Sequence, residues 1–325
     1  MSAQPHIAPR AAPLLSVVIP VFNEESCLPA LFARLYPALD LLKRPYECIF
    51  VDDGSTDCSV ALLRQMFQRR PRETRLVILR GNFGQHVAIR AGFERVRGEF
   101  IVTMDADLQN PPEEIAKLLA CFREGYDYVG TIRQQRRDKW WRRRSSALMN
   151  ALRERISGIR MTDQGCMLRG YSRTIVDAIN QSREISTFVP ALGSLYALHP
   201  TEIPIRHEER DSGVSKYSLY RLIRLNFDLM TGFSLAPLQL FSLAGIAIAL
   251  LSLLFVVFLA VRRLLVGPEA QGVFTLFALV FLLIGIVLFG IGLLGEYVGR
   301  IYLQVRDRPR YLVDAVVEED RGDAP

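Results

Sequence analysis

Short apolar stretches alternate with amphipathic stretches along the first part of the chain. Five runs rich in apolar and β-branched residues, without a helical period, predict strands at residues 15–19, 48–51, 76–79, 100–104 and 128–131. Four runs with apolar residues at three- and four-residue spacing predict helices between them, at residues 28–42, 60–68, 86–95 and 113–122. Strands that alternate with crossover helices form a parallel sheet, so this pattern predicts an α/β domain.

Two long, nearly uncharged stretches follow this domain. Residues 237–261 and 272–295 each match the ~20 residues that span a bilayer core. We predict two transmembrane helices, with a buried helical hairpin of a soluble protein as the alternative. Arginines flank the pair on its outer sides, at positions 221, 224, 300, 306, 308 and 310. The positive-inside rule therefore places both ends in the cytosol, although Arg262 and Arg263 in the connection weaken this signal.

Changes of composition divide the chain into five segments. The first is a flexible N-terminus that lacks the apolar core of a signal peptide. A cytosolic domain, amphipathic juxtamembrane helices, a transmembrane hairpin and a cytosolic tail follow it. In this order, the predicted segments are residues 1–13, 14–215, 216–236, 237–295 and 296–325.

The chain carries a formal net charge of +6, and basic chains often bind nucleic acid. Here, however, the positive charge is concentrated beside apolar and aromatic residues. The stretch RRDKWWRRR at residues 136–144 is typical of a helix in a membrane interface, with a solvated basic face as the alternative. Because no nucleic-acid motif accompanies it, we expect a lipid bilayer and no nucleic acid as a partner.

Cysteine and glycine patterns argue against two other kinds of site. The five cysteines are scattered without a Cys-x-x-Cys pair, which indicates reduced thiols rather than structural zinc. The phosphate-binding pattern GxxxxGK[ST] is absent. A GxGxxG pattern does occur at Gly290, Gly292 and Gly295, but it lies inside the second apolar stretch. There it predicts close helix packing and not a dinucleotide site.

Polar side chains follow four of the predicted strands, in the segments PVFNEE (20–25), DDGSTD (52–57), RGNFGQH (80–86) and DADLQN (105–110). The carboxyl ends of parallel strands meet at one edge of a sheet, which is where ligands usually bind. Acids there can accept the N–H of a base and the ribose hydroxyls. Asp105 and Asp107 can hold a hard cation that neutralises a diphosphate. Each segment alone is also an ordinary turn or helix cap, but four in succession favour a nucleotide site.

The motifs VVIPVFNEE, VDDGSTD and DADLQNPPEE resemble the donor site of glycosyltransferase family 2 with its GT-A fold, in particular the membrane-anchored polyprenyl-phosphate glycosyltransferases. The similarity extends to TDQGCMLRGY (162–171), RHEERDSGVSKYS (206–218) and the late GLLGEYVGRIY, and so covers residues 14–311. The resemblance implies a mixed, mostly parallel sheet with flanking helices, followed by amphipathic interfacial helices and a transmembrane hairpin. It also implies a multi-pass protein of the bacterial inner membrane, with the catalytic domain and both termini in the cytoplasm.

The resemblance further implies a role for individual residues. Those that would contact the uridine nucleotide are Pro20, Glu25, Asp52, Asp53 and Asp105. Asp105 and Asp107 would form the Asp-x-Asp motif for Mg²⁺ or Mn²⁺, with Asp107 as the more direct ligand, and Asp163 stands where the family places its catalytic base. The positions that would hold the lipid phosphate or the donor diphosphate are Arg206, Arg210, Ser215 and Lys216.

The activity implied by the resemblance is metal-dependent transfer, with inversion, from a UDP-sugar donor to undecaprenyl phosphate, in the service of lipid A modification and resistance to cationic peptides such as polymyxin. The favoured sugar is 4-deoxy-4-formamido-L-arabinose. Glucose from UDP-glucose and mannose from GDP-mannose are the alternatives. A processive polysaccharide synthase fits less well, because the chain has no Gln-x-x-Arg-Trp motif and too few predicted spans. A membrane-anchored nucleotide-sugar sensor would be the non-enzymatic alternative, and a homo-oligomer is compatible with the small residues of the second span.

The chemistry of this acceptor bears on Asp163. A phosphate ester has a second pKa of about 6, so its attacking oxygen is already anionic near neutral pH. A strong general base is then hardly needed. Asp163 could instead orient a substrate or stabilise positive charge at the anomeric carbon, and we leave its role open between these possibilities.

Overall fold

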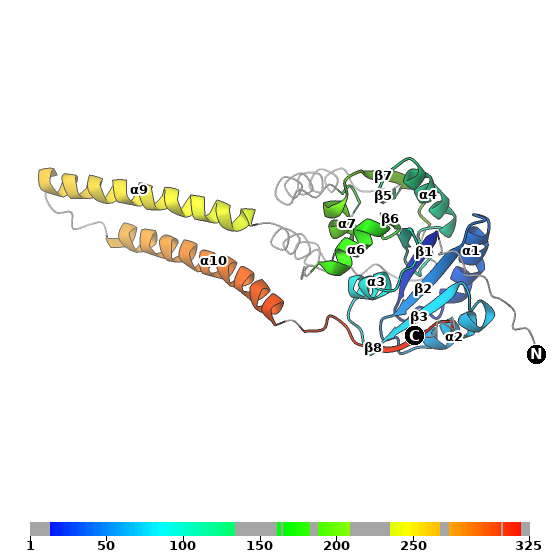
Figure 1. Cartoon of the computed structure of the whole chain (residues 1–325). Coiled ribbons are helices and arrows are strands. Elements are labelled where there is room, and N and C mark those ends of the chain that lie inside the picture. Colours follow the sequence, from blue (N-terminus) through cyan, green and yellow to red (C-terminus); the bar gives the residue numbers. More distant parts are fainter. Residues whose placement is uncertain are drawn as a thin grey trace, which may run out of the picture.

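The computed structural model describes residues 14–133, 161–163, 165–182, 188–208, 235–266, 273–306 and 308–319. It shows an α/β domain from which two long helices extend (Figure 1). The basic segment 136–144 and nearly all of the predicted juxtamembrane segment 216–236 lie outside the described residues.

The centre of the domain is an eight-stranded sheet with the order β7-β5-β6-β4-β1-β2-β3-β8. Its strands are β1 (Leu15–Val21), β2 (Tyr46–Asp52), β3 (Thr74–Leu79), β4 (Phe100–Thr103), β5 (Tyr128–Arg133), β6 (Arg169–Ser172), β7 (Pro200–Ile205) and β8 (Val313–Val317). The pairs β1–β2, β1–β4, β2–β3 and β5–β7 are parallel, and β6 and β8 pair antiparallel with their neighbours. The predicted mixed, mostly parallel sheet is confirmed.

The helices that join these strands are α1 (Leu28–Asp40), α2 (Ser59–Arg69), α3 (Gln85–Phe93), a 3-10 turn (Pro112–Glu114) that leads into α4 (Ile115–Arg123), α6 (Arg173–Gln181) and α7 (Val189–Tyr196). All five predicted strands and all four predicted helices of the first part of the chain are present. Three strands were not predicted. β6 is only four residues long, β7 has two prolines as an edge strand can, and β8 follows the apolar helices.

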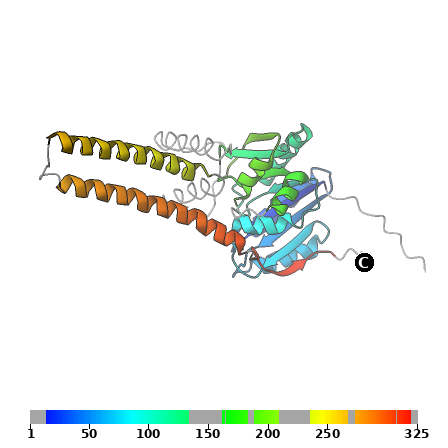
Figure 2. The ribbon, with the colours of Figure 1, turned by 60° about the vertical axis from the view of Figure 1, so that its left-hand side comes forward.

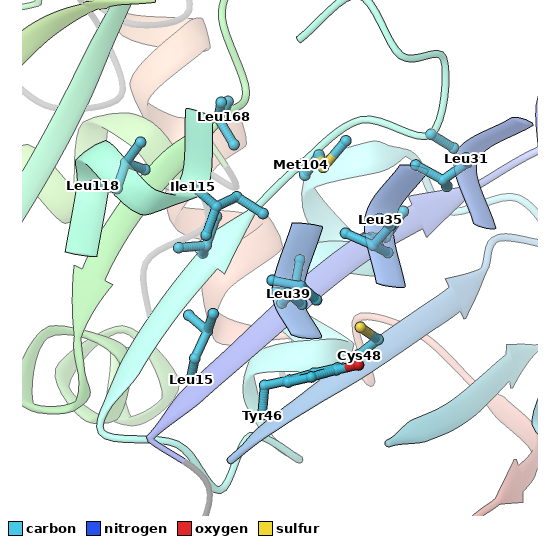
Figure 3. Packing of buried hydrophobic residues seen from close by; sticks show 14 of the residues in the cluster. Leu15, Leu31, Leu35, Leu39, Tyr46, Cys48, Met104, Ile115, Leu118 and Leu168 are labelled. Carbon is cyan, nitrogen blue, oxygen red and sulfur yellow. The ribbon is translucent and has the colours of Figure 1, made fainter. Parts of the chain in front are cut away.

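The sheet buries both of its faces. Alternate residues of β1 point to opposite sides, so Leu15 and Val17 join one apolar cluster while Val18 joins the other. The first cluster includes side chains of α1, α2 and α4, and Figure 3 shows Leu31 and Leu35 of α1 within it. The second includes side chains of α3, α6 and α7. These two layers fix the sheet, so that its strand ends can carry polar loops.

Two long helices, α9 (Ala236–Val266) and α10 (Val273–Val305), cover the two apolar stretches and lie side by side in both views (Figures 1 and 2). Close packing is confirmed at Gly290, because a Cβ added there would lie 2.3 Å from the ring of Phe241 on α9. Gly292 and Gly295 have no such neighbour. Within the described residues, Leu282–Val305 is long and apolar enough to cross a membrane, and Leu238–Ile248 is a shorter apolar stretch. The two-span arrangement and the bounds of its spans stay predictions.

The segment that follows α10 returns to the sheet as β8, which pairs antiparallel with β3 (Figure 1). Ion pairs fasten this strand. Glu318 contacts Arg75 at 2.6 Å and Arg97 at 2.9 Å. The predicted C-terminal tail therefore contributes an edge strand of the eight-stranded sheet.

We expect Gly54 to tolerate no side chain. Its φ is +73°, and a Cβ there would lie 2.5 to 2.8 Å from the backbone of Gly81 and Asn82. Gly54→Ala should therefore destabilise the protein by about 2 kcal/mol or more, measured as the thermal unfolding midpoint in detergent. Gly125→Ala is the matched control, because Gly125 also has a positive φ, +95°, but open space around it. Equal shifts for both variants would contradict the close approach of the two loops.

Candidate active site

The segments singled out in the sequence meet at one edge of the sheet. β1, β2, β3 and β4 run parallel, so the residues that follow them gather at the carboxyl edge. Residues 161–163 and 165–168 join them there, because β6 runs antiparallel to β4 and Arg169, its first residue, pairs with Thr103 at the end of β4. The structure thus brings the candidate donor-site residues and Asp163 to a single edge.

Asp53 joins the loops that follow β2 and β3. Its side chain is buried, and its two carboxylate oxygens accept hydrogen bonds from the backbone N–H groups of Phe83 and Gly84, each at 2.8 Å. Burial raises the pKa of Asp53, and these two hydrogen bonds oppose that rise. Asp53 therefore holds the shape of the loops, while each of its oxygens keeps a second lone pair.

Asp52 keeps a free oxygen. Its Oδ2 accepts the N–H of Ser55 at 3.1 Å, whereas its Oδ1 is buried without a hydrogen-bond partner. A buried acceptor without a partner is costly, so a ligand that donates a hydrogen bond would stabilise it. Of the two neighbouring aspartates, Asp52 is therefore the better candidate for contact with a base or ribose.

Pro20 lies near the end of β1, and Glu25 belongs to the loop that follows this strand. Glu25 is exposed, and its Oε2 accepts the N–H of Cys58 at 2.9 Å, next to the start of α2. Pro20 pairs with Val51 in the sheet, so it lies beside the start of the Asp52 loop. Asn23, which the sequence did not single out, fastens the same two loops through its Oδ1 and the N–H of Thr56 at 2.8 Å.

The Asp-x-Asp pair lies after β4. The side-chain amide of Gln85, the first residue of α3, donates to Asp105 at 2.5 Å, and Asp107 accepts the N–H of Gln109 at 3.1 Å. Burial, and then the negative charge of Asp107, raise the pKa of Asp105 to about 7. Two carboxylates that oppose each other's ionisation are a setting that a divalent cation relieves.

A metal at this pair would need further ligands. Within the described ranges, no group of three or more histidine, cysteine, aspartate or glutamate side chains could hold an ion. Mg²⁺ commonly takes one or two carboxylates and completes its shell with water and substrate phosphates. Asp105 and Asp107 fit such an open site.

Asp163 is held in an ion pair. It is buried, and both of its oxygens accept from Arg133, with Nε–Oδ2 at 2.7 Å and Nη2–Oδ1 at 2.9 Å. Burial acts to raise the pKa of Asp163, but the Arg133 guanidinium outweighs it and holds the pKa below its usual value. A carboxylate with a lowered pKa is a weak base, which favours an orienting role over proton abstraction.

Arg169 stabilises the turn that carries Asp163. It is fully buried and donates to the backbone carbonyls of Cys166 and Asp163 and to the hydroxyl of Tyr128. Neither Arg133 nor Arg169 was singled out from the sequence, although Arg169 lies in the segment TDQGCMLRGY that carries the resemblance. A buried arginine leaves no periodic signal, because charged residues are expected at the surface.

The candidate acceptor residues are only partly described. Arg206 directly follows β7 and is exposed, while Arg210, Ser215 and Lys216 lie outside the described residues. The stretch that begins with Arg206 is anchored beside the Asp-x-Asp loop. The N–H of Glu208 donates to the carbonyl of Gln109 at 2.9 Å, and Arg34 binds Glu208 at 2.8 Å. The candidate acceptor segment therefore begins next to the loop of Asp105 and Asp107.

Comparison with known proteins agrees with this geometry. Residues 16–179 match the profile described as Glycosyl transferase family 2. The chain belongs to this family and is therefore an enzyme that transfers a sugar. It is 48% identical over 311 residues to the undecaprenyl-phosphate 4-deoxy-4-formamido-L-arabinose transferase of Edwardsiella ictaluri (strain 93-146), covering 95% of this chain and 96% of the relative.

The protein of the same name from Yersinia pestis (strain Pestoides F) is 51% identical over 305 residues, covering 93% of each chain. Among solved structures, the chain is similar to glucosyl-3-phosphoglycerate synthase from Mycobacterium tuberculosis in complex with Mn²⁺, UDP and glucosyl-3-phosphoglycerate. That match has a TM-score of 0.46 and 16% identity, and covers 68% of this chain and 78% of the other.

The Arg133–Asp163 pair predicts how Asp163 variants behave. Asp163→Asn leaves Arg133 without its counter-charge, so we expect a loss of about 2–3 kcal/mol of stability. Because the pKa of Asp163 is lowered, its stabilising effect is complete above about pH 4 and is lost only as the pH falls through the folded-state pKa. The deficit of the variant in thermal unfolding should therefore stay constant from pH 5.5 to 8.

The double variant Asp163→Asn with Arg133→Gln separates the two roles of Asp163. It removes both charges and should recover part of the lost stability. If the double variant also recovered the transfer rate, a direct role of Asp163 towards substrate would be contradicted. A stability deficit that disappeared between pH 8 and 5.5 would contradict the lowered pKa.

Proposed function

We propose that the chain transfers 4-deoxy-4-formamido-L-arabinose from a UDP-sugar to undecaprenyl phosphate and releases UDP. The observation that carries this proposal is the similarity of 48% to 51% over nearly the whole length of relatives that bear this name. The geometry supports it, because the carboxyl edge of the sheet offers acids for a nucleotide and a carboxylate pair beside an exposed arginine.

The donor would lie along the loops after β1, β2 and β4. The free Oδ1 of Asp52 would accept a hydrogen bond from the base or the ribose, within loops that Asp53 and Glu25 hold in place. Asp105 and Asp107 would hold Mg²⁺ or Mn²⁺, which neutralises the diphosphate and stabilises it as a leaving group. The exposed Arg206, with Arg210, Ser215 and Lys216 of the segment that follows it, would bind the acceptor phosphate.

The reaction is a single in-line displacement. An anionic oxygen of the lipid phosphate attacks the anomeric carbon, the bond from this carbon to the diphosphate oxygen breaks, and UDP leaves with the electron pair. The configuration at the anomeric carbon is inverted. No proton has to be removed from the acceptor near neutral pH. This agrees with a site in which Asp163 is tied to Arg133 and orients rather than abstracts.

A lipid acceptor fits a chain with membrane helices. β7 and β8 belong to one sheet, so the chain must return to the side of the bilayer from which it departs between Ile205 and Val313. It must therefore cross the bilayer an even number of times in this interval. If Leu282–Val305 crosses, a second crossing is required, and α9 is the apolar helix beside it. We propose two spans in the bacterial inner membrane, with the catalytic domain and both termini in the cytoplasm.

The direct test is a transfer assay with purified protein in detergent, undecaprenyl phosphate and Mg²⁺ or Mn²⁺. UDP-4-formamido-arabinose, UDP-glucose and GDP-mannose are supplied separately, and lipid-linked sugar and released nucleotide are measured. We expect product with the first donor alone. Asp107→Ala should reduce this turnover by about a hundredfold or more while leaving the unfolding midpoint within a degree or two of wild type. Asp177→Ala is the matched control, because Asp177 lies in α6 and forms an exposed ion pair with Arg173.

Two results would overturn parts of this proposal. Product from UDP-glucose or GDP-mannose in place of the formamido donor would retain the reaction class and reject the sugar. Full turnover by Asp107→Ala would reject the metal role of this loop.

A further inference from the structure

One histidine at the carboxyl edge of the sheet has a ring nitrogen without a hydrogen-bond partner among the described residues. His86, the second residue of α3, has its Nδ1 buried without a partner, although the residue as a whole is only half-buried. A buried polar atom that stays unpaired is uncommon and costly in a folded protein. The other ring nitrogen, Nε2, is not buried without a partner in this way.

The residues before His86 place it next to the donor site. Phe83 and Gly84 donate their backbone N–H groups to Asp53, and Gln85 donates its side-chain amide to Asp105. The first turn of α3 therefore lies between the proposed nucleotide loop and the proposed metal loop.

The imidazole packs against the start of α7. Phe188 lies edge-on against it, with ring centroids 4.9 Å apart and an interplanar angle of 70°. The charge of Arg169, which donates to the carbonyl of Asp163, also acts on His86. His86 directly follows Gln85, which binds Asp105, so its ring lies close to the carboxylates that would bind the diphosphate. In a nucleotide sugar bound in this way, the group next to the diphosphate is the transferred sugar.

The surroundings decide the protonation state of the ring. Burial, and secondly the positive charge of Arg169, lower the pKa of His86 to about 4, so the imidazole is neutral near pH 7. A neutral imidazole has one N–H donor and one acceptor. An unpaired buried N–H is rarer than an unpaired acceptor, which favours the tautomer with the hydrogen on Nε2. The ring then offers one N–H donor to the site.

We propose that His86 is a specificity-determining residue, whose imidazole donates a hydrogen bond to an oxygen substituent of the transferred sugar. This inference rests on the proposed function, because it identifies the sugar-binding part of the same site. The ligand class is a sugar with a carbonyl or hydroxyl oxygen towards α3, and Phe188 limits the space behind the ring.

The test compares three substitutions of His86 with wild type in the full-length protein. The measured quantities are kcat/KM for UDP-4-formamido-arabinose, the inhibition constant of UDP and the unfolding midpoint. His86→Leu should lower kcat/KM by about 10- to 100-fold, because it removes a hydrogen bond to a buried substrate group. The inhibition constant of UDP should stay within about twofold of the wild-type value, because UDP lacks the transferred sugar. His199→Gln, at an exposed turn before β7, is the control.

Rescue by shape separates hydrogen bonding from packing. The amide nitrogen of Gln reaches the position of Nε2, whereas that of Asn reaches only the position of Nδ1. We therefore expect His86→Gln to recover most of the lost kcat/KM and His86→Asn to recover little. Equal losses in all three variants, a weaker binding of UDP, or an unchanged kcat/KM in His86→Leu would each overturn the inference.

The role of His86 can still be tested if the transferred sugar is not 4-formamido-arabinose. Wild-type activity with another donor and none with UDP-4-formamido-arabinose would reject the proposed function. The same variants assayed with that other donor would still decide the role of His86. Loss in His86→Leu with recovery in His86→Gln would support it, and no loss would overturn it.

Discussion

The carboxylate of Asp53 is the constraint on which the donor site depends. It occupies both of its oxygens with the N–H groups of Phe83 and Gly84, and so it fixes the loop after β3 against the loop after β2. Gly54 permits this contact because no side chain separates the two backbones. The contacts of the first turn of α3 depend on this loop arrangement. Gln85 reaches Asp105 and His86 packs against Phe188 only if the helix begins at this place. Asp53 therefore shapes the candidate site, and its neighbour Asp52 carries an oxygen without a hydrogen-bond partner among the described residues.

Charge is compensated differently on the two sides of the site. Asp163 is fully engaged by Arg133, so its negative charge is neutralised within the protein before any substrate arrives. Asp105 and Asp107, in contrast, have no arginine or lysine in an ion pair within the described residues, and their mutual repulsion together with burial raises the pKa of Asp105. An unbalanced carboxylate pair attracts a cation, whereas a balanced one only orients its neighbours. This difference supports the proposal that one turn binds the metal and the other positions a substrate.

The sequence predicted what periodicity and loop chemistry encode. The strands and helices between Leu15 and Arg133 follow from apolar spacing, and the polar loops follow from the parallel direction of their strands. It could not predict β8, because nothing local in VDAVV says that the chain returns to β3 after α10. The pairing of Arg133 with Asp163 and the burial of Arg169 were also missed, because contacts between residues far apart in sequence leave no pattern in either segment. The different hydrogen bonding of Asp52 and Asp53 was missed for the same reason, since only the fold shows which carboxylate oxygens already have a partner.

We propose that one sheet edge holds a nucleotide sugar between the Asp52 loop and the Asp163 turn. A structure of the protein in lipid nanodiscs with UDP and Mn²⁺, determined by electron cryomicroscopy, would test this placement. We expect the uridine beside Asp52, a metal ion at Asp107 next to the diphosphate, and an empty space between this diphosphate, His86 and Asp163 that is large enough for one sugar. A nucleotide bound elsewhere, or a diphosphate whose open end points away from His86 and Asp163, would contradict it.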